Sequence, residues 1–186
     1  MSNRLFSFVG GDTGFWRVTT MEAVTGEPLP AISRLDVSSA TYSPSTNGST
    51  WCLRGIISHE HYVDREERTE IVAKQLPLGR LEATRAALIP IRKNPDWWVL
   101  TQNERMSIFK DKSHHTRIGL QTFPALARRL LHCRDLSEDE PFDFLTWFEY
   151  EPADEALFDQ LLGELRAIPE WDYVEREMDI RLVWDK

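Results

Sequence analysis

One continuous stretch decides the fold, 142-FDFLTWFEYEPADEALFDQLLGELRAIPEWDYVEREMDIRLV-183. Its middle part, residues 154–165, places leucine and phenylalanine at helical spacing after a proline, which predicts a helix. Residues 173–183 alternate apolar with charged side chains, apart from one slip, as a half-buried antiparallel strand does. Residues 142–150 carry aromatic side chains on both faces, which is typical of a strand buried between layers or at a subunit contact. The stretch therefore predicts a strand–helix–strand unit.

A weaker copy of the same unit precedes it. The strand-like run Trp51–Ile57 leads into a charged, helix-like stretch from Asp64 to Gln75, and a second apolar run follows at Ala86–Ile91. An echo this long is a repeated supersecondary unit rather than a solenoid period. We expect two halves, residues 1–93 and 94–186.

Composition limits the classes of partner. The 186 residues include 22 basic and 30 acidic side chains, a net charge of −8, which argues against nucleic acid as the main partner. No apolar run has the length of a membrane span, so no membrane contact is expected. Cys52 and Cys133 lie in unrelated contexts and are predicted to be reduced thiols in a cytoplasmic protein. The stretch 33–49, rich in Ser, Thr and Asn, is predicted to be a loop.

A helical insert, residues 94–133, lies between the repeated units. Its first turn starts at Asn94, before a proline, and its two tryptophans are expected in the core or in a pocket wall. A second helix is expected over 104–120, and a third over 125–132 after the break at Pro124. His115 and Arg128 would then lie on two different helices, from which both can reach one cavity.

The string 113-SHHTRIGLQTFPALARRLLHCRD-135 resembles the haem-binding region of chlorite dismutases, in particular of their short, dimeric branch. Residues 74–80, 88–93, 142–150 and 171–177 extend the resemblance over nearly the whole chain. It implies an α+β fold, a duplicated ferredoxin-like repeat of the dimeric α+β barrel type, with one haem b per subunit in the C-terminal half. It also implies a cytoplasmic homodimer that converts chlorite, a small anion, to chloride and dioxygen with formation of an O–O bond.

The resemblance implies that His115 is the proximal ligand of the haem iron. His114 is the nearest rival, but neighbours on a helix point about 100° apart, so only one of the two can face the iron. The family also hydrogen-bonds a glutamate to the proximal imidazole, and we place that role on Glu170, with Glu175 and Glu177 as alternatives. Such a carboxylate strengthens the imidazole as a ligand and sets its tautomer.

The resemblance further implies that Arg128 is the catalytic guanidinium on the distal side, and that Gln75 can hold it by a hydrogen bond. A guanidinium stays protonated at any working pH, attracts an anion, and would keep the chlorine–oxygen fragment beside the iron. Arg129 is expected to solvate a helix face.

Two other functions stay open. A coproporphyrin-type haem decarboxylase shares the fold but lacks the distal arginine, so Arg128 counts against it. A non-catalytic haem carrier or sensor would need no guanidinium beside the iron.

Overall fold

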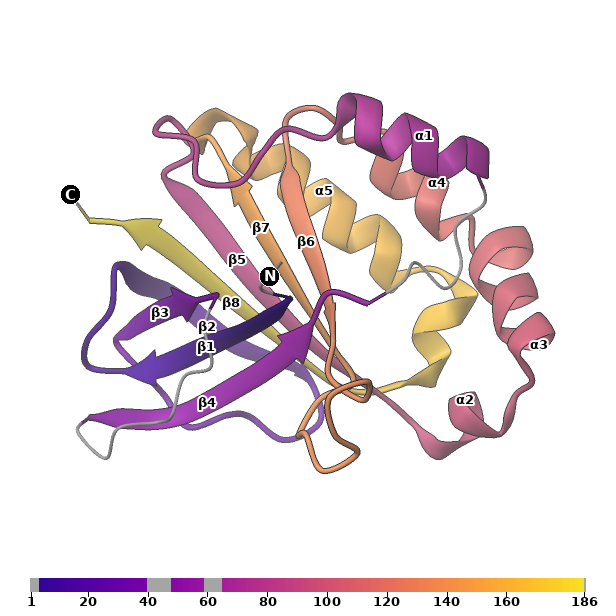
Figure 1. The fold of residues 1–186 in the computed structure, drawn as a ribbon, viewed down its shortest axis with the longest axis horizontal. Helices are drawn as coiled ribbons and strands as arrows, with labels where there is room; N and C mark the ends of the chain where they lie inside the picture. Colours follow the sequence, from indigo (N-terminus) through magenta and orange to yellow (C-terminus); the bar gives the residue numbers. More distant parts are fainter. Residues whose placement is uncertain (1–3, 40–47, 59–64, 186) are drawn as a thin grey trace.

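The computed structural model describes residues 4–39, 48–58 and 65–185. Within them, eight strands form a closed antiparallel barrel in the order β1-β3-β2-β8-β5-β7-β6-β4 (Figure 1). The barrel closes between β4 and β6 through a single residue pair, Ile56 opposite His132. The strands are β1 (Leu5–Gly11), β2 (Trp16–Thr25), β3 (Arg34–Ser38), β4 (Ser49–Ile56), β5 (Arg85–Lys93), β6 (Ala127–His132), β7 (Phe144–Tyr150) and β8 (Val174–Trp184).

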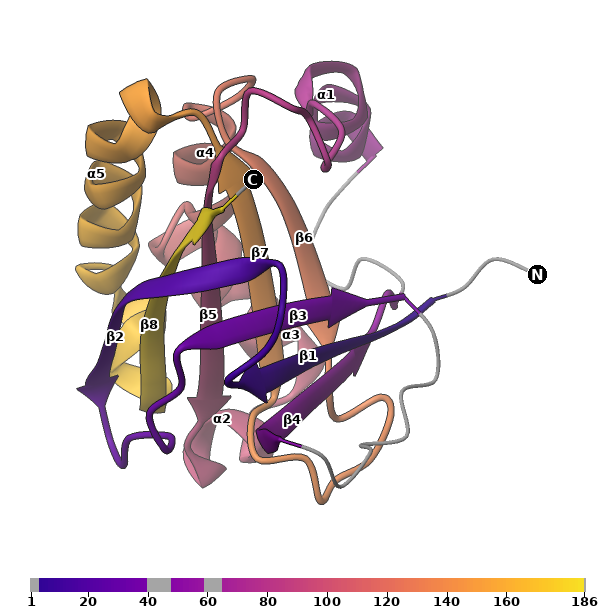
Figure 2. The same ribbon diagram turned by 90° about the vertical axis from the view of Figure 1, so that its left-hand side faces the viewer.

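Helices cover one side of the barrel. Figure 2 shows α5 against the outside of the barrel wall, and α1 and α4 lie near one another at the edge next to β6. The helices are α1 (Arg65–Lys74), α2 (Pro95–Val99), α3 (Gln102–Met106), α4 (His115–Leu120) and α5 (Glu155–Arg166). A π-helical segment (Ser107–Lys112) precedes α4, and two 3₁₀ turns (Pro152–Asp154 and Pro169–Tyr173) flank α5. None of the helices described is long and apolar enough to cross a membrane.

Two apolar clusters hold the fold together, and strand β5 contributes to both. Its residues Ala86 and Leu88 point into the barrel, whereas Ala87, Ile89 and Ile91 point outward. The outward cluster is closed by one face of α5, formed by Phe158, Leu161, Leu162 and Leu165. β7 is buried in the same two-sided way, which confirms a strand lying between layers.

The alternation of β8 is confirmed, but its charged face is not a solvent face. Met178, Ile180 and Leu182 fill the barrel. On the other face, Glu177 and Asp179 pair with Arg166 of α5, at 2.7 Å and 3.1 Å. The helix therefore covers the charged side, and buried ion pairs replace water there.

The prediction of a helix over 125–132 is wrong. Residues Ala127 to His132 form β6, which pairs with β7 from Ala127 opposite Glu149 to His132 opposite Phe144. An apolar pattern over so few residues suits a helix and a strand equally, and main-chain pairing with β7 decides between them. The helix expected over 104–120 is also interrupted, because it consists of α3, the π-helical segment and α4.

Other expected elements are present at nearly the expected bounds: α1, α5, β4, β5, β7, β8 and the turn of α2. Sequence reasoning missed β1, β2 and β3, the last inside the predicted loop 33–49, of which residues 40–47 lie outside the described part. β5, placed in the first half by sequence, pairs with β7 and β8. The repeat and its boundary after residue 93 stay predictions.

Candidate active site

A cavity of about 380 Å³ lies between the outer faces of β5, β6 and β7 and the helices. Its wall is mainly apolar. Ile71, Ile89, Ile91, Phe109, Leu130, Phe144, Phe148, Leu162, Leu165, Trp97 and Trp171 contribute to it. All four site residues expected from sequence also line it: Gln75, His115, Arg128 and Glu170. Residues from both halves of the chain are thus brought to one apolar chamber that holds a few polar groups, a common design of ligand sites.

His115 is the first residue of α4, and the local backbone explains its orientation. His114 before it adopts a left-handed conformation, with φ of 49°, and this turns the chain between the π-helical segment and α4. As a result His114 is exposed and His115 faces the cavity. The imidazole of His115 stacks on Phe109, with ring centres 4.4 Å apart and planes at 17°.

The Nδ1 atom of His115 lies 2.7 Å from Oε2 of Glu170, a residue in the turn before β8. Lys93 at the end of β5 donates from Nζ to the other oxygen, Oε1, at 2.8 Å. The main-chain N–H of Glu170 donates to the hydroxyl of Ser113 at 3.1 Å. The alternatives Glu175 and Glu177 pair elsewhere, with Arg92 and Arg166 respectively.

Electrostatics keep this carboxylate ionised. Burial on its own would raise the pKa of Glu170, but the contacts with His115 and Lys93 outweigh it and lower the pKa to about 2. An ionised carboxylate can only accept hydrogen bonds, so Nδ1 of His115 donates to it. The other ring nitrogen, Nε2, is therefore the one that can bind a metal ion.

Lys93 was not singled out by sequence reasoning. Its side chain is buried, and burial lowers its pKa against the opposing influence of Glu170. The ammonium lies 4.6 Å from the ring centre of Trp97 and 5.4 Å from that of Trp171. The available signal was a lysine close after the apolar run Ala86–Ile91, because a cation buried at the end of such a run must find a carboxylate inside the protein.

Arg128 reaches the cavity from strand β6, not from a helix as expected. Its guanidinium lies 5.3 Å from the ring centre of Phe123. Burial lowers the pKa of Arg128, and among the described residues no carboxylate counters that effect. The side chain is thus a cation without a protein counter-ion in the part of the chain described, placed in an apolar wall.

Arg129 also belongs to the cavity lining, but neighbouring side chains of a strand point to opposite faces, so its side chain extends toward the barrel. Its guanidinium lies 4.4 Å from the ring centre of Phe6, which belongs to the barrel core. The expectation that Arg129 solvates a helix face is wrong, because residues 127–132 form strand β6 and not a helix.

Gln75 follows α1 and contacts Arg128, although not at the expected atom. Its Nε2 donates to the main-chain carbonyl oxygen of Arg128 at 2.6 Å, rather than to the guanidinium. Gln75 therefore ties the end of α1 to strand β6 and holds the backbone from which the guanidinium extends.

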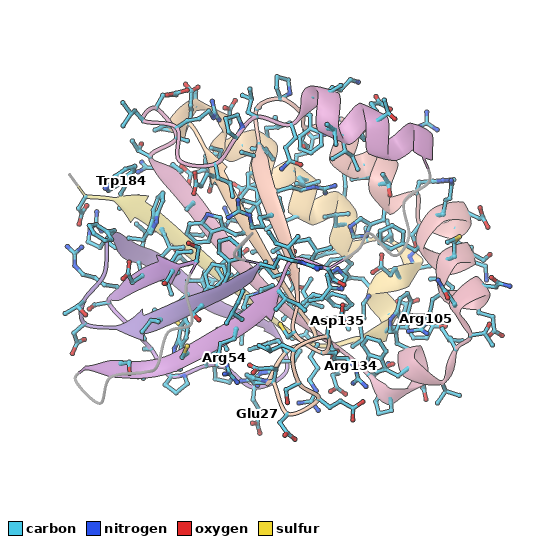
Figure 3. All side chains as sticks on the ribbon, in the orientation of Figure 1. Glu27, Arg54, Arg105, Arg134, Asp135 and Trp184 are labelled. Carbon is cyan, nitrogen blue, oxygen red and sulfur yellow. The ribbon has the colours of Figure 1, made fainter. Side chains whose placement is uncertain are left out.

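The two neighbouring tryptophans have different surroundings. Trp97 is buried and lines the cavity, with its ring centre 5.3 Å from that of Tyr173. The guanidinium carbons of Arg105 and Arg134 lie 5.5 Å and 4.1 Å from the ring centre of Trp98, and Figure 3 labels both arginines. Trp97 is thus a pocket wall, and Trp98 an aromatic platform for two cations.

Known proteins resemble this chain over most of its length. The structure of a dimeric chlorite dismutase from Nitrobacter winogradskyi is 52% identical, with a TM-score of 0.88, covering 96% of this chain and 99% of that one. A chlorite dismutase from Candidatus Nitrospira defluvii, solved with imidazole, shares the fold at 16% identity, with a TM-score of 0.66, covering 97% of this chain and 91% of that one.

A curated chlorite dismutase from Ideonella dechloratans is 35% identical over 88 residues. That match covers 47% of this chain and only 28% of the curated relative. No protein-family model matches the chain. Over half of the aligned residues are identical to those of the Nitrobacter protein, across nearly the full length of both chains, and the chain therefore belongs to the chlorite dismutase family.

Proposed function

We propose that this protein is a haem b-dependent chlorite dismutase, which converts chlorite to chloride and dioxygen. The observation that carries the proposal is that His115 and Arg128 line one apolar cavity from different elements. His115 has a carboxylate partner, whereas Arg128 has none among the residues that the structure describes. The names of the Nitrobacter and Ideonella relatives support the same reaction. The atoms balance, since one ClO₂⁻ gives one Cl⁻ and one O₂.

The residues of the cavity fit a haem. A porphyrin needs apolar walls and one good protein ligand, and the cavity supplies both. Leu130, on the cavity wall, is 46% exposed, and an apolar ligand in the cavity would cover it. His115 would hold the iron through Nε2. When bound, the haem supplies the redox chemistry that breaks a Cl–O bond and forms the O–O bond.

Around His115, the chain orients the ligand. Glu170 accepts a hydrogen bond from the N–H at Nδ1 of His115, so the tautomer that leaves Nε2 available is the stable one. Lys93 and Ser113 in turn hold Glu170 from its side chain and its main chain. The negative charge on Glu170 makes the imidazole a stronger electron donor than a neutral acceptor would.

Arg128 supplies the positive charge for the substrate. A guanidinium in an apolar wall, with no carboxylate beside it in the described part of the chain, attracts chlorite more strongly than a guanidinium in water does. Both oxygen atoms of one chlorite must end in one dioxygen molecule. A chlorine–oxygen fragment that escapes from the cavity therefore lowers the yield of dioxygen. The same cation would retain an anionic chlorine–oxygen fragment until the reaction is complete. Gln75 holds the main chain of Arg128 while this happens.

We also propose the homodimeric, cytoplasmic form with one haem in the C-terminal half of each subunit. The Nitrobacter relative is described as dimeric, which supports the assembly. Cys52 and Cys133 are both unpaired, as is usual in a reducing compartment.

The test is an oxygen-electrode measurement on haem-loaded protein. Wild type should release dioxygen from chlorite, and Arg128→Ala should release less per chlorite consumed, with hypochlorite detectable in solution. Arg117→Ala, which removes an exposed arginine of the same helix as His115, should match wild type. A loaded protein that releases no dioxygen contradicts the proposal. If that protein instead converts iron coproporphyrin to haem b with peroxide, the decarboxylase function replaces it.

A further inference from the structure

Gly119 is a buried residue inside helix α4, four positions after His115. Glycine weakens a helix interior relative to alanine, so it needs a reason there. The backbone gives none, because Gly119 is not among the residues with positive φ. The reason is space: a Cβ atom at this position would lie 2.7 Å from Nη1 of Arg128 and 3.3 Å from its Cζ.

The guanidinium of Arg128 therefore rests directly on the surface of α4. The ring of Phe123, just beyond the helix, forms a second side of this seat, with its centre 5.3 Å from Cζ. The hydroxyl of Thr122 donates to the carbonyl oxygen of Gly119 at 2.8 Å and closes the turn between them. The cation is held by packing instead of by a carboxylate in the described chain, which leaves its N–H groups for an anion.

We propose that Gly119 is a positioning residue, whose missing side chain sets where the Arg128 guanidinium stands relative to the helix that carries His115. The inference rests on the proposed function, because it takes Arg128 as the group that binds the anion. It adds a link between the two sides of the site: one short helix presents the imidazole at its first residue and seats the opposing cation at its fifth.

The variant Gly119→Ala tests the inference with little risk to folding. The atoms in the way belong to the flexible end of a side chain, which can move, and alanine is the better helix former. Its melting temperature should equal or exceed that of wild type. Gly163→Ala is the matched control, because Gly163 is an exposed helical glycine of α5 with nothing within 4 Å of the added Cβ.

The main readout is binding of fluoride to the haem-loaded ferric protein, followed by absorption spectroscopy. Fluoride is an anion and a hydrogen-bond acceptor, so its affinity reports on the guanidinium. Gly119→Ala should bind fluoride about tenfold more weakly, the effect of one displaced charge-assisted hydrogen bond, and its KM for chlorite should rise. Gly163→Ala should bind fluoride as wild type does.

The double variant separates the possible causes. If Gly119 acts through Arg128, then adding Gly119→Ala to Arg128→Ala should weaken fluoride binding no further. A further loss in the double variant, or an unchanged affinity in Gly119→Ala alone, overturns the inference. If Arg128→Ala itself binds fluoride as tightly as wild type, the role given to Arg128 in the proposed function fails instead. The two failures are therefore distinguishable.

Discussion

The imidazole of His115 and the carboxylate of Glu170 meet at 2.7 Å, which joins helix α4 to the turn before β8. The same carboxylate accepts from Lys93 through its other oxygen, so its single negative charge is shared between an imidazole and a buried ammonium. The arrangement places a negative charge one hydrogen bond away from Nδ1 of His115, and the donor strength of Nε2, the ring nitrogen proposed to bind iron, should depend on it.

Glu170→Gln should raise the reduction potential of the bound haem. The substitution replaces a carboxylate with a neutral amide and so removes the negative charge that makes the imidazole electron-rich. An electron-rich ligand stabilises ferric iron more than ferrous iron, so the ferric state loses more stability. A shift on the order of 60 mV, about 1.4 kcal/mol for a one-electron couple, is expected. Spectroelectrochemical titration measures it. A haem-loaded variant with the potential of wild type would show that the charge of Glu170 does not reach the iron.

His115→Ala should abolish stable haem binding, whereas His114→Ala should keep it. The first side chain lines the cavity and the second is exposed. Absorption spectra of both variants, reconstituted with one equivalent of haemin, give the answer. Imidazole added to His115→Ala should restore a ligand to the site. The opposite pattern between the two variants would transfer the ligand role to His114.

Gln75→Ala should loosen α1 from strand β6. The variant loses the hydrogen bond from Nε2 of Gln75 to the carbonyl oxygen of Arg128, worth about 1 kcal/mol of unfolding free energy. Urea unfolding measures the loss, and amide hydrogen exchange should become faster in α1. Gln160→Ala, which removes an exposed glutamine of α5, should change the unfolding free energy by less than about 0.5 kcal/mol. Equal effects of the two variants would contradict a specific role for Gln75.

Glu177→Gln should destabilise the protein far more than Glu175→Gln, although both residues belong to β8. Glu177 is fully buried and accepts hydrogen bonds from Arg166 and from Nε1 of Trp171, each at 2.8 Å. Leaving Arg166 without that partner should cost about 3 kcal/mol, whereas the half-exposed pair of Glu175 with Arg92 is worth at most about 1 kcal/mol. Chemical unfolding of both variants tests the difference, and similar losses would refute it.

Tyr150 should make the protein lose stability at alkaline pH. Burial is the main reason that its pKa is raised to about 12, from an ordinary value of 10.0. Between these two values the folded state holds a proton that the unfolded state has released, so stability is full below pH 10 and falls as pH rises toward 12. The loss should reach about 3 kcal/mol. Urea unfolding at pH 9 and at pH 12 should show this additional loss in wild type and not in Tyr150→Phe.

Sequence by itself determined the elements whose periodicity is long and whose ends are marked. Helix α5 carries five apolar residues at helical spacing over 12 residues. Helix α2 is preceded by its N-cap Asn94, whose side chain accepts a hydrogen bond from the N–H of Trp97. The alternation of β8 is equally plain. These signals are local, because a helix or strand face repeats along the chain itself. The resemblance in residues 113–135 likewise led to the cavity residues without knowledge of the fold.

Only the tertiary structure decided which strand or helix holds each of those residues and which distant residues it contacts. Arg128 lies on a strand because β7 offers main-chain hydrogen bonds along the whole of β6. A six-residue pattern cannot indicate pairing with residues 12 to 22 positions away in the chain. The same holds for Gln75, which bonds to a carbonyl 53 residues away, for Lys93, which meets Glu170 across 77 residues, and for the seat that Gly119 provides. Periodicity reports what one element buries, whereas contacts between distant residues depend on how the closed barrel brings its strands together.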